Sequence, residues 1–188
     1  MAIRERVQAI RLVVLDVDGV MTDGGIIVDD HGVERKRFHV LDGSATWLLR
    51  RCGIETAIIS GRSVPCVAHR AKDLRIEDCI QGAADKVKAF QELIARRGLE
   101  PRECAYMGDD VLDVPLLRAV GFAAAPANAR PEAKRAAHLV TEARGGDGAV
   151  REMAEAILKG QGRWDGLLRE KYGVEPEPEP ETAPGPAT

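Results

Sequence analysis

The sequence predicts an α/β fold, a doubly wound and mostly parallel sheet with helices on both faces. Three observations favour it. Short apolar runs rich in β-branched residues alternate along the chain with segments of helical periodicity. Polar residues follow several of these runs at the point where each run ends. The 188 residues, of which 45% are hydrophobic, suffice for the core of one domain and hardly for two.

Six short apolar runs are the expected strands: Leu12–Val17, Glu55–Ile59, Glu77–Ile80, Cys104–Met107, Gly121–Ala124 and His138–Thr141. Helices are expected between them, because parallel neighbours need a crossover connection. The clearest is Ala84–Arg97, in which Val87, Phe90 and Leu93 recur at helical spacing. A second, Gly148–Lys159, closes the domain.

One segment after the first strand departs from this alternation. Gly24–Asp29 and Val33–His39 are strand-like runs on either side of Asp30-His31-Gly32, which is a turn signal. The sequence therefore predicts a β-hairpin, here called the flap, at about residues 24–39.

The end of the chain divides into two parts. Residues 174–188 carry five of the ten prolines in a Glu-Pro alternation without large apolar residues, so a disordered tail is expected there. Residues 160–173 are too apolar for a free tail, and Trp164 and Leu168 have i, i+4 spacing. This segment is expected either to pack as a short helix on its own domain or to reach a neighbouring subunit. The predicted domain spans residues 1–173.

Composition excludes several function classes. The 27 basic and 30 acidic residues give a net charge of −3, and the basic residues are scattered, which argues against nucleic acid or a membrane surface as a partner. The four cysteines are far apart and lack the spacing of a disulfide framework or a zinc site. No apolar run is long enough for a signal or membrane-spanning segment, so a cytoplasmic protein is expected.

The polar residues that follow the strands are Asp16, Asp18, Ser60, Arg62, Lys86, Asp109, Asp110 and Asp113. Because the carboxyl ends of parallel strands share one edge of the sheet, these residues are expected to line one crevice. Clustered carboxylates repel one another unless a cation offsets them, and oxygen-only ligands favour Mg²⁺ over zinc. Taken singly, Ser60 is equally typical of a helix N-cap, Lys86 of a solvated surface lysine, and the later aspartates of a helix start.

Four motifs in order resemble those of the haloacid dehalogenase-like (HAD-like) phosphatases: residues 16–24 (DVDGVMTDG), Ser60-Gly61-Arg62, Lys86, and Gly108-Asp109-Asp110. More narrowly, the flap, His39–Gly43 and Gly145–Glu152 look like the 3-deoxy-D-manno-octulosonate (KDO) 8-phosphate phosphatases, which serve lipopolysaccharide precursor synthesis. The resemblance covers nearly all of residues 10–160. It implies a HAD-like Rossmannoid fold and a Mg²⁺-dependent phosphomonoesterase.

The resemblance also implies a role for each motif residue. Asp16 is the expected nucleophile, which forms an aspartyl-phosphate, and Asp18 the expected general acid and base. Mg²⁺ would bind Asp16, the main-chain carbonyl of Asp18, and Asp109, while Ser60 and Lys86 would bind the phosphate.

Other residues are expected to support the site or to read the substrate. Asp113 would orient Lys86 or a metal-bound water, and Asp110 is either a supporting residue or a helix-start residue. Arg62 and Arg70 are candidates for binding the sugar-acid carboxylate, because a guanidinium matches its geometry. His39, Asp42 and Gly43 would line the sugar hydroxyls.

Family members usually cover the site with an inserted cap domain, but the spacing of the motifs here leaves room for none. An open site and an exposed hairpin favour a homo-oligomer assembled through the flap, by resemblance a tetramer. Three alternative functions share parts of this pattern. A phosphatase of a nonulosonate 9-phosphate and a non-catalytic oligomeric homologue stay open. A phosphorylation-switched signalling domain has its motifs in a different order.

Overall fold

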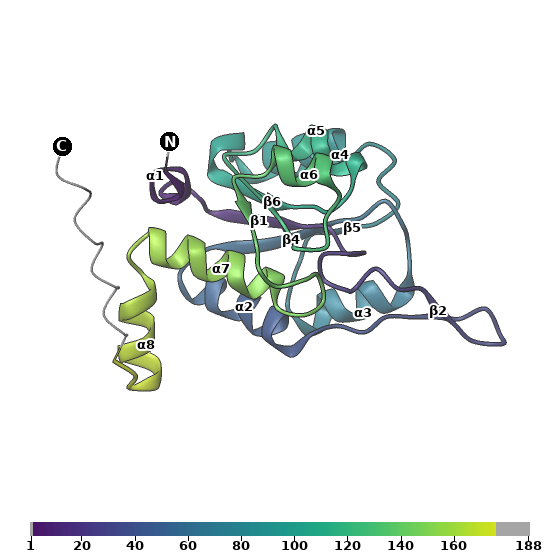
Figure 1. Cartoon of the computed structure of the whole chain (residues 1–188), viewed down its shortest axis with the longest axis horizontal. Helices are drawn as coiled ribbons and strands as arrows, with labels where there is room; N and C mark the ends of the chain where they lie inside the picture. The colour runs from purple at the N-terminus through teal and green to yellow at the C-terminus, as the bar shows by residue number, and fades with distance from the viewer. Residues whose placement is uncertain (1, 176–188) are drawn as a thin grey trace, which may run out of the picture.

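The computed structural model describes residues 2–175 and contains one six-stranded sheet, in which all neighbouring strands are parallel (Figure 1). Its order is β5-β4-β1-β6-β7-β8, with β1 Leu12–Leu15, β4 Glu55–Ile59, β5 Cys79–Ile80, β6 Cys104–Met107, β7 Phe122–Ala125 and β8 Leu139–Val140. The predicted strands are all present: β4 and β6 have the expected bounds, β7 is shifted by one residue, and β1, β5 and β8 are shorter than expected. The prediction of a tail from residue 174 falls outside the described residues, apart from Val174 and Glu175.

The helices are α1 Ile3–Val7, α2 Val40–Arg51, α3 Pro65–Asp73, α4 Lys86–Arg97, α5 Val114–Leu117, α6 Pro131–Ala136, α7 Ala149–Gly160 and α8 Trp164–Tyr172, with 3₁₀ turns η1 Pro101–Glu103 and η2 Val111–Asp113. Figure 1 shows α4, α5 and α6 on one face of the sheet and α2, α3 and α7 on the other. Two apolar cores result, one on each face. The doubly wound fold predicted from the sequence is therefore confirmed.

Strand β1 lies at the centre of the sheet and takes part in both cores. Leu12 and Val14 pack into the core beneath α4–α6, and Val13 and Leu15 into the opposite one, so all four are buried. This two-sided burial explains why the strand reads as an uninterrupted apolar run. Its neighbours are β4 and β6, with Leu15 in register with Ile58 and Met107. The residues that follow these three strands are consequently brought together at one edge.

Two predicted boundaries are wrong for local reasons. The first strand ends at Leu15 rather than Val17, because the carbonyl of Val17 already accepts the N–H groups of the following turn. The helix predicted from Ala84 begins at Lys86, because the carboxylate of Asp85 accepts the N–H of Lys88 at 2.9 Å as an N-cap.

The flap is a separate two-stranded antiparallel sheet of β2 Ile27–Val28 and β3 Glu34–Arg35, which confirms the predicted hairpin with shorter strands. It projects from the body of the molecule next to α3 (Figure 1). Ile26, Ile27, Val28 and Val33 are each more than half exposed. Residues 2–175 contain no inserted cap domain, so the flap is the main addition to the sheet and its helices.

Helix α8 packs on its own domain in this single chain. Leu167 is buried, and Trp164 and Leu168 line a groove together with residues of α2 and α7. The guanidinium of Arg163 donates to the carbonyl of Cys52. The helix between residues 160 and 173 is thus confirmed, and in one chain it matches the self-packing alternative. No helix of the described residues is long and apolar enough to cross a bilayer.

Candidate active site

Asp16 and Lys86 form the centre of the site at the carboxyl ends of β1 and β4. Lys86 Nζ lies 3.0 Å from Asp16 Oδ1 and 2.7 Å from Asp113 Oδ1. The Lys86 side chain is only 11% exposed, so the interpretation of a solvated surface lysine is wrong. Burial works against its charge, but the two carboxylates more than offset this effect and raise the pKa of Lys86. Lys86 is therefore a fixed cation beside the Asp16 carboxylate.

Asp113 accepts hydrogen bonds on both carboxylate oxygens. Its Oδ1 accepts from Lys86 Nζ and, at 2.6 Å, from the hydroxyl of Tyr106, while its Oδ2 accepts the main-chain N–H groups of Asp109 at 2.9 Å and Asp110 at 3.0 Å. Its side chain is 1% exposed. Asp113 therefore holds Lys86 and the loop after β6 in place, in agreement with the predicted supporting role.

The acidic groups fit a divalent cation. Carboxylate oxygens of Asp16, Asp109 and Asp113 lie within 4.8 Å of one another. Burial, opposed mainly by Lys86, raises the pKa of Asp16 to about 6, and burial together with the charges of Asp16 and Asp113 raises that of Asp109 to about 7. A bound cation would offset the cost of burying these negative charges close together, and the all-oxygen donor set favours Mg²⁺. Because Asp113 is already fully hydrogen-bonded, Asp16 and Asp109 are the carboxylates available to it.

Close backbone approach brings the loop after β1 to Asp109. Gly19 has φ +80°, and a Cβ at this position would lie 2.1 Å from Asp109 Oδ2. Only glycine accommodates both this backbone conformation and this contact.

A cavity of about 310 Å³ lies over these groups. Its lining residues are Asp16, Asp18, Gly19, Gly24, Ser60, Gly61, Arg62, Lys86, Asp109, Asp110, Leu112 and Asp113. All four predicted motifs thus meet at one cavity, as expected. Ser60 lies at its wall and is 3% exposed, whereas α3 has Val64 as its N-cap, so the helix-cap interpretation of Ser60 is wrong. Asp110 caps η2 by accepting the N–H of Val111 at 2.7 Å, as its helix-start alternative requires.

Asp18 faces a group of charges that comes from the flap. Lys36 Nζ donates to Asp18 Oδ1 and, at 2.8 Å, to Glu34 Oε1. Arg62 Nη2 lies 2.5 Å from Glu34 Oε2, and Arg62 Nε lies 4.0 Å from Asp18 Oδ2. Sequence reasoning identified Asp18 and Arg62 but missed Glu34 and Lys36. It also missed Tyr106, whose hydroxyl is buried against Asp113.

The remaining predicted substrate residues do not line this cavity. Asp42 is buried and accepts the main-chain N–H groups of Gly148 at 3.2 Å and Arg151 at 3.0 Å, so it caps the start of α7. Its pKa is raised because burial outweighs these bonds. Arg70 pairs with Asp73 at 2.6 Å and would lie 2.4 Å from a Cβ on Gly43.

His39 is the N-cap residue of α2, and its buried Nδ1 has no hydrogen-bond partner among residues 2–175. In the described part of the chain the buried Nε of Arg70 also lacks a hydrogen-bond partner, and the guanidinium carbon of Arg70 lies 5.6 Å from the ring centroid of Phe38. His39, Gly43 and Arg70 thus belong to the region where the flap joins α2, beside the cavity rather than in it.

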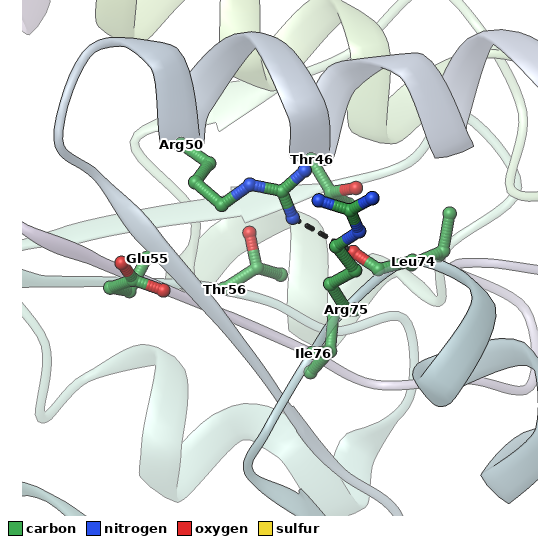
Figure 2. Close-up of a pocket in the computed structure, with 7 residues that line it drawn as sticks. All are labelled: Thr46, Arg50, Glu55, Thr56, Leu74, Arg75 and Ile76. Atoms are coloured by element: carbon green, nitrogen blue, oxygen red, sulfur yellow. Dashed lines mark hydrogen bonds between the residues drawn. The ribbon is translucent and has the colours of Figure 1, made fainter.

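A second cavity lies between α2, the start of β4 and residues 74–76, away from the carboxyl ends of the strands. Figure 2 shows Arg50 directed to the carbonyl of Leu74, to which it donates at 3.1 Å. The hydroxyl of Thr56 is buried there, and no described residue forms a hydrogen bond with it. Its volume of about 10 Å³ matches a single water molecule and excludes a sugar phosphate.

Comparison with known proteins agrees with this geometry. A family model described as haloacid dehalogenase-like hydrolase matches residues 75–153. The 3-deoxy-D-manno-octulosonate 8-phosphate phosphatase KdsC of Yersinia pestis is 42% identical over 162 residues, which cover 86% of this chain and 87% of that protein. The chain belongs to this phosphatase family. KdsC of Escherichia coli K12 is 40% identical over 160 residues, 85% of each protein.

Solved structures of the phosphatase family have the same fold. The enzyme of Moraxella catarrhalis, solved with a magnesium ion, a phosphate ion and a KDO molecule, matches with a TM-score of 0.87 and 40% identity over 89% of this chain and 97% of that one. A probable YrbI family phosphatase of Pseudomonas syringae gives a TM-score of 0.87 at 43% identity, over 89% and 96%. Membership in the KDO 8-phosphate phosphatase family makes this chain a HAD-like phosphoric monoester hydrolase.

Proposed function

We propose that this enzyme hydrolyses KDO 8-phosphate to KDO and phosphate in lipopolysaccharide precursor synthesis, through an aspartyl-phosphate on Asp16. The observation that carries the proposal is the cavity that unites Asp16, Asp18, Ser60, Lys86 and Asp109 at one edge of the sheet. The relatives with the same fold and about 40% identity are phosphatases of this substrate.

The first half of the reaction transfers the phosphoryl group to the protein. An Asp16 carboxylate oxygen attacks phosphorus, the bond from phosphorus to the sugar oxygen breaks, and Asp18 donates a proton to that oxygen. Lys86 and the hydroxyl of Ser60 hold the phosphoryl oxygens during the transfer. Mg²⁺, held by Asp16, Asp109 and the main-chain carbonyl of Asp18, supplies positive charge that neutralises the phosphate and the carboxylates.

The second half restores the enzyme. Asp18, which has lost its proton, accepts one from a water molecule as that water attacks the phosphorus of the aspartyl-phosphate. The bond from phosphorus to the Asp16 oxygen breaks, and inorganic phosphate leaves. Asp113 keeps Lys86 in place throughout, because its two oxygens are already used in fixing Lys86, Tyr106 and the loop after β6.

Substrate selection is proposed to rest on groups at the mouth of the cavity. Arg62 is 43% exposed there and matches a sugar-acid carboxylate. Arg70, His39, Asp42 and Gly43 are proposed to act beside the cavity, where the flap joins α2. A nonulosonate 9-phosphate is the alternative substrate, because it shares the carboxylate and the primary phosphate.

We further propose that the enzyme is a cytoplasmic homotetramer that assembles through the flap. The exposed apolar residues of the flap, Ile26–Val28 and Val33, support the interface. The four free cysteines support the compartment. In such an assembly α8 would lie near a neighbouring cavity. Light scattering, which measures the molar mass in solution, tests the assembly by comparing the wild type with an Ile27→Lys variant. We expect a tetrameric wild type and a variant that assembles less. If the wild type and the variant are both monomeric, the proposed assembly is wrong.

Phosphate release from a substrate panel tests the activity. KDO 8-phosphate, a nonulosonate 9-phosphate and simple sugar phosphates are compared with Mg²⁺ and with excess chelator. We expect KDO 8-phosphate to give the highest kcat/KM, and chelation to abolish turnover. Preference for the nonulosonate 9-phosphate would favour the alternative substrate.

The matched variant Asp16→Asn should fold normally and release no phosphate, because an amide is nearly isosteric but not nucleophilic. Turnover by Asp16→Asn at the wild-type rate would contradict the mechanism. A wild type inactive on every compound would instead favour the non-catalytic homologue.

A further inference from the structure

The flap returns one buried lysine to the active site. Lys36 directly follows β3, and its side chain is only 1% exposed. A buried lysine is costly unless carboxylates pair with it, and Lys36 has two, Asp18 and Glu34. Asp18 lines the cavity, and Glu34 also pairs with Arg62, which lines it. The reaction steps described above use neither Lys36 nor Glu34.

The contacts of Lys36 close a ring of four alternating charges. Glu34 Oε2 binds Arg62 Nη2 at 2.5 Å, and Arg62 Nε returns to within 4.0 Å of Asp18 Oδ2. Each Asp18 oxygen therefore faces one cation, Lys36 on one side and Arg62 on the other. Two anchors at fixed positions determine the direction of a carboxylate more narrowly than one does.

The neighbouring basic residues of the flap do not share this arrangement. Arg35 pairs with Asp29 at 3.2 Å and is 69% exposed, and Arg37 pairs with Asp147 at 3.0 Å and is 53% exposed. Side chains alternate along an extended segment, so Glu34 and Lys36 point toward Asp18 and Arg62, whereas Arg35 and Arg37 pair elsewhere. The inward contacts are thus a property of two residues and not of a generally basic flap.

We propose that Lys36, held by Glu34, is a positioning residue that aims the Asp18 carboxylate at the leaving oxygen of the substrate. The flap thereby completes the acid-base part of the site from outside the sheet. This inference rests on the proposed role of Asp18 as general acid and base. It predicts that loss of Lys36 damages proton donation to the leaving group more than phosphoryl transfer itself.

Leaving groups that differ in their need for a proton separate these effects. The sugar alkoxide of KDO 8-phosphate needs a proton as it leaves, whereas the nitrophenolate of p-nitrophenyl phosphate leaves without one. We expect Lys36→Met to lower kcat/KM, which reports the steps up to phosphoryl transfer to Asp16, about tenfold to a hundredfold for KDO 8-phosphate and about threefold or less for p-nitrophenyl phosphate. Arg35→Met is the matched control, and it should change neither rate.

Two further variants keep the test decisive if Lys36→Met folds poorly. Lys36→Arg retains the charge and should recover part of the KDO 8-phosphate rate. Glu34→Gln removes the charge that holds Lys36. It should also slow the reaction of KDO 8-phosphate more than that of p-nitrophenyl phosphate, but by a smaller factor than Lys36→Met does. Equal losses on both substrates in Lys36→Met and Glu34→Gln, together with lowered thermal stability, would show a purely structural flap contact and overturn the proposal.

A double-mutant cycle with Asp18→Asn distinguishes this inference from the role of Asp18 itself. If Lys36 acts through Asp18, Lys36→Met adds nothing to the leaving-group dependence of Asp18→Asn. Full additivity would overturn the positioning role of Lys36 and leave the role of Asp18 intact. If Asp18→Asn lowers kcat/KM equally for both substrates, the proposed role of Asp18 as general acid is itself wrong.

Discussion

Replacing Asp113 with alanine is expected to destabilise the domain and to slow turnover at the same time. The Asp113 carboxylate is 1% exposed and receives four donors: Lys86 Nζ, the Tyr106 hydroxyl and two main-chain N–H groups. Alanine leaves the buried Tyr106 hydroxyl without an acceptor for its proton, although Lys86 Nζ still donates to it at 3.4 Å, and removes one of the two anions beside Lys86. The loop that carries Asp109 then also loses its anchor.

The size of the effect follows from these contacts. A buried donor left without an acceptor costs about 1–3 kcal/mol, and breaking a buried charge pair costs about 3–5 kcal/mol. Lys86 keeps Asp16 as a partner, and the two N–H groups can reach solvent in the cavity, so the lower part of the combined range applies. We therefore expect a loss of about 3–5 kcal/mol in the free energy of unfolding. For a domain of this size, this corresponds to a Tm lower by roughly 6–20 °C.

Urea denaturation and thermal unfolding of the metal-free protein measure the stability, and single-turnover phosphate release measures the chemistry. Asp110→Ala is the matched control, because this aspartate makes only an exposed capping bond and should cost about 1 kcal/mol. Tyr106→Phe removes one of the four bonds and should fall between the two variants. An Asp113→Ala protein with wild-type Tm would show that the carboxylate does not anchor the site, and would refute this reasoning.

Three other predictions concern the metal, the substrate and the C-terminus. Because the pKa of Asp16 is raised to about 6 and that of Asp109 to about 7, the metal-free fold loses stability as the pH rises through this range, and Mg²⁺ should raise Tm more at about pH 7.5 than at about pH 5. Equal Tm shifts would contradict this. Arg70→Ala should lower kcat/KM for KDO 8-phosphate about tenfold to a hundredfold but spare an aryl phosphate, and equal losses would exclude carboxylate recognition. Ending the chain after Gly173 should change neither stability nor kinetics, whereas ending it after Gly160 should lower Tm because α8 covers its own domain. If the chain that ends after Gly160 has an unchanged Tm but an altered KM, residues 160–173 instead cover the cavity of a neighbouring subunit.

The sheet and its order of elements were predictable because the central strands are buried on both faces. Such strands read as short, continuous apolar runs, as Leu12–Leu15 does. Strand ends were less predictable, because they depend on turns such as the one that begins at the Val17 carbonyl. The helix at 164–172 was predicted from spacing, but its contact surface depends on α2 and α7, far away in sequence.

The gathering of the motif residues around one cavity was predictable, because most of the motifs lie directly after the strands that position them. Lys36 was not, because it stands in the charged run Glu34-Arg35-Lys36-Arg37, which resembles a solvated surface. The alternation of Glu34, Lys36 and Phe38 along the strand was the available signal. Asp42 was assigned to the substrate, and its bonds to the start of α7, more than 100 residues away, have no counterpart in local sequence.

The separation of the flap from the six-stranded sheet has a consequence for how this enzyme can change over time. Asp16 and Ser60 directly follow strands of the central sheet and Lys86 begins α4, whereas the flap is a separate two-stranded hairpin. Insertions or exchanges within residues 24–35 would leave both cores intact. Laboratory evolution that randomises this hairpin, with Glu34 and Lys36 retained, should therefore yield folded hydrolases with new preferences at high frequency.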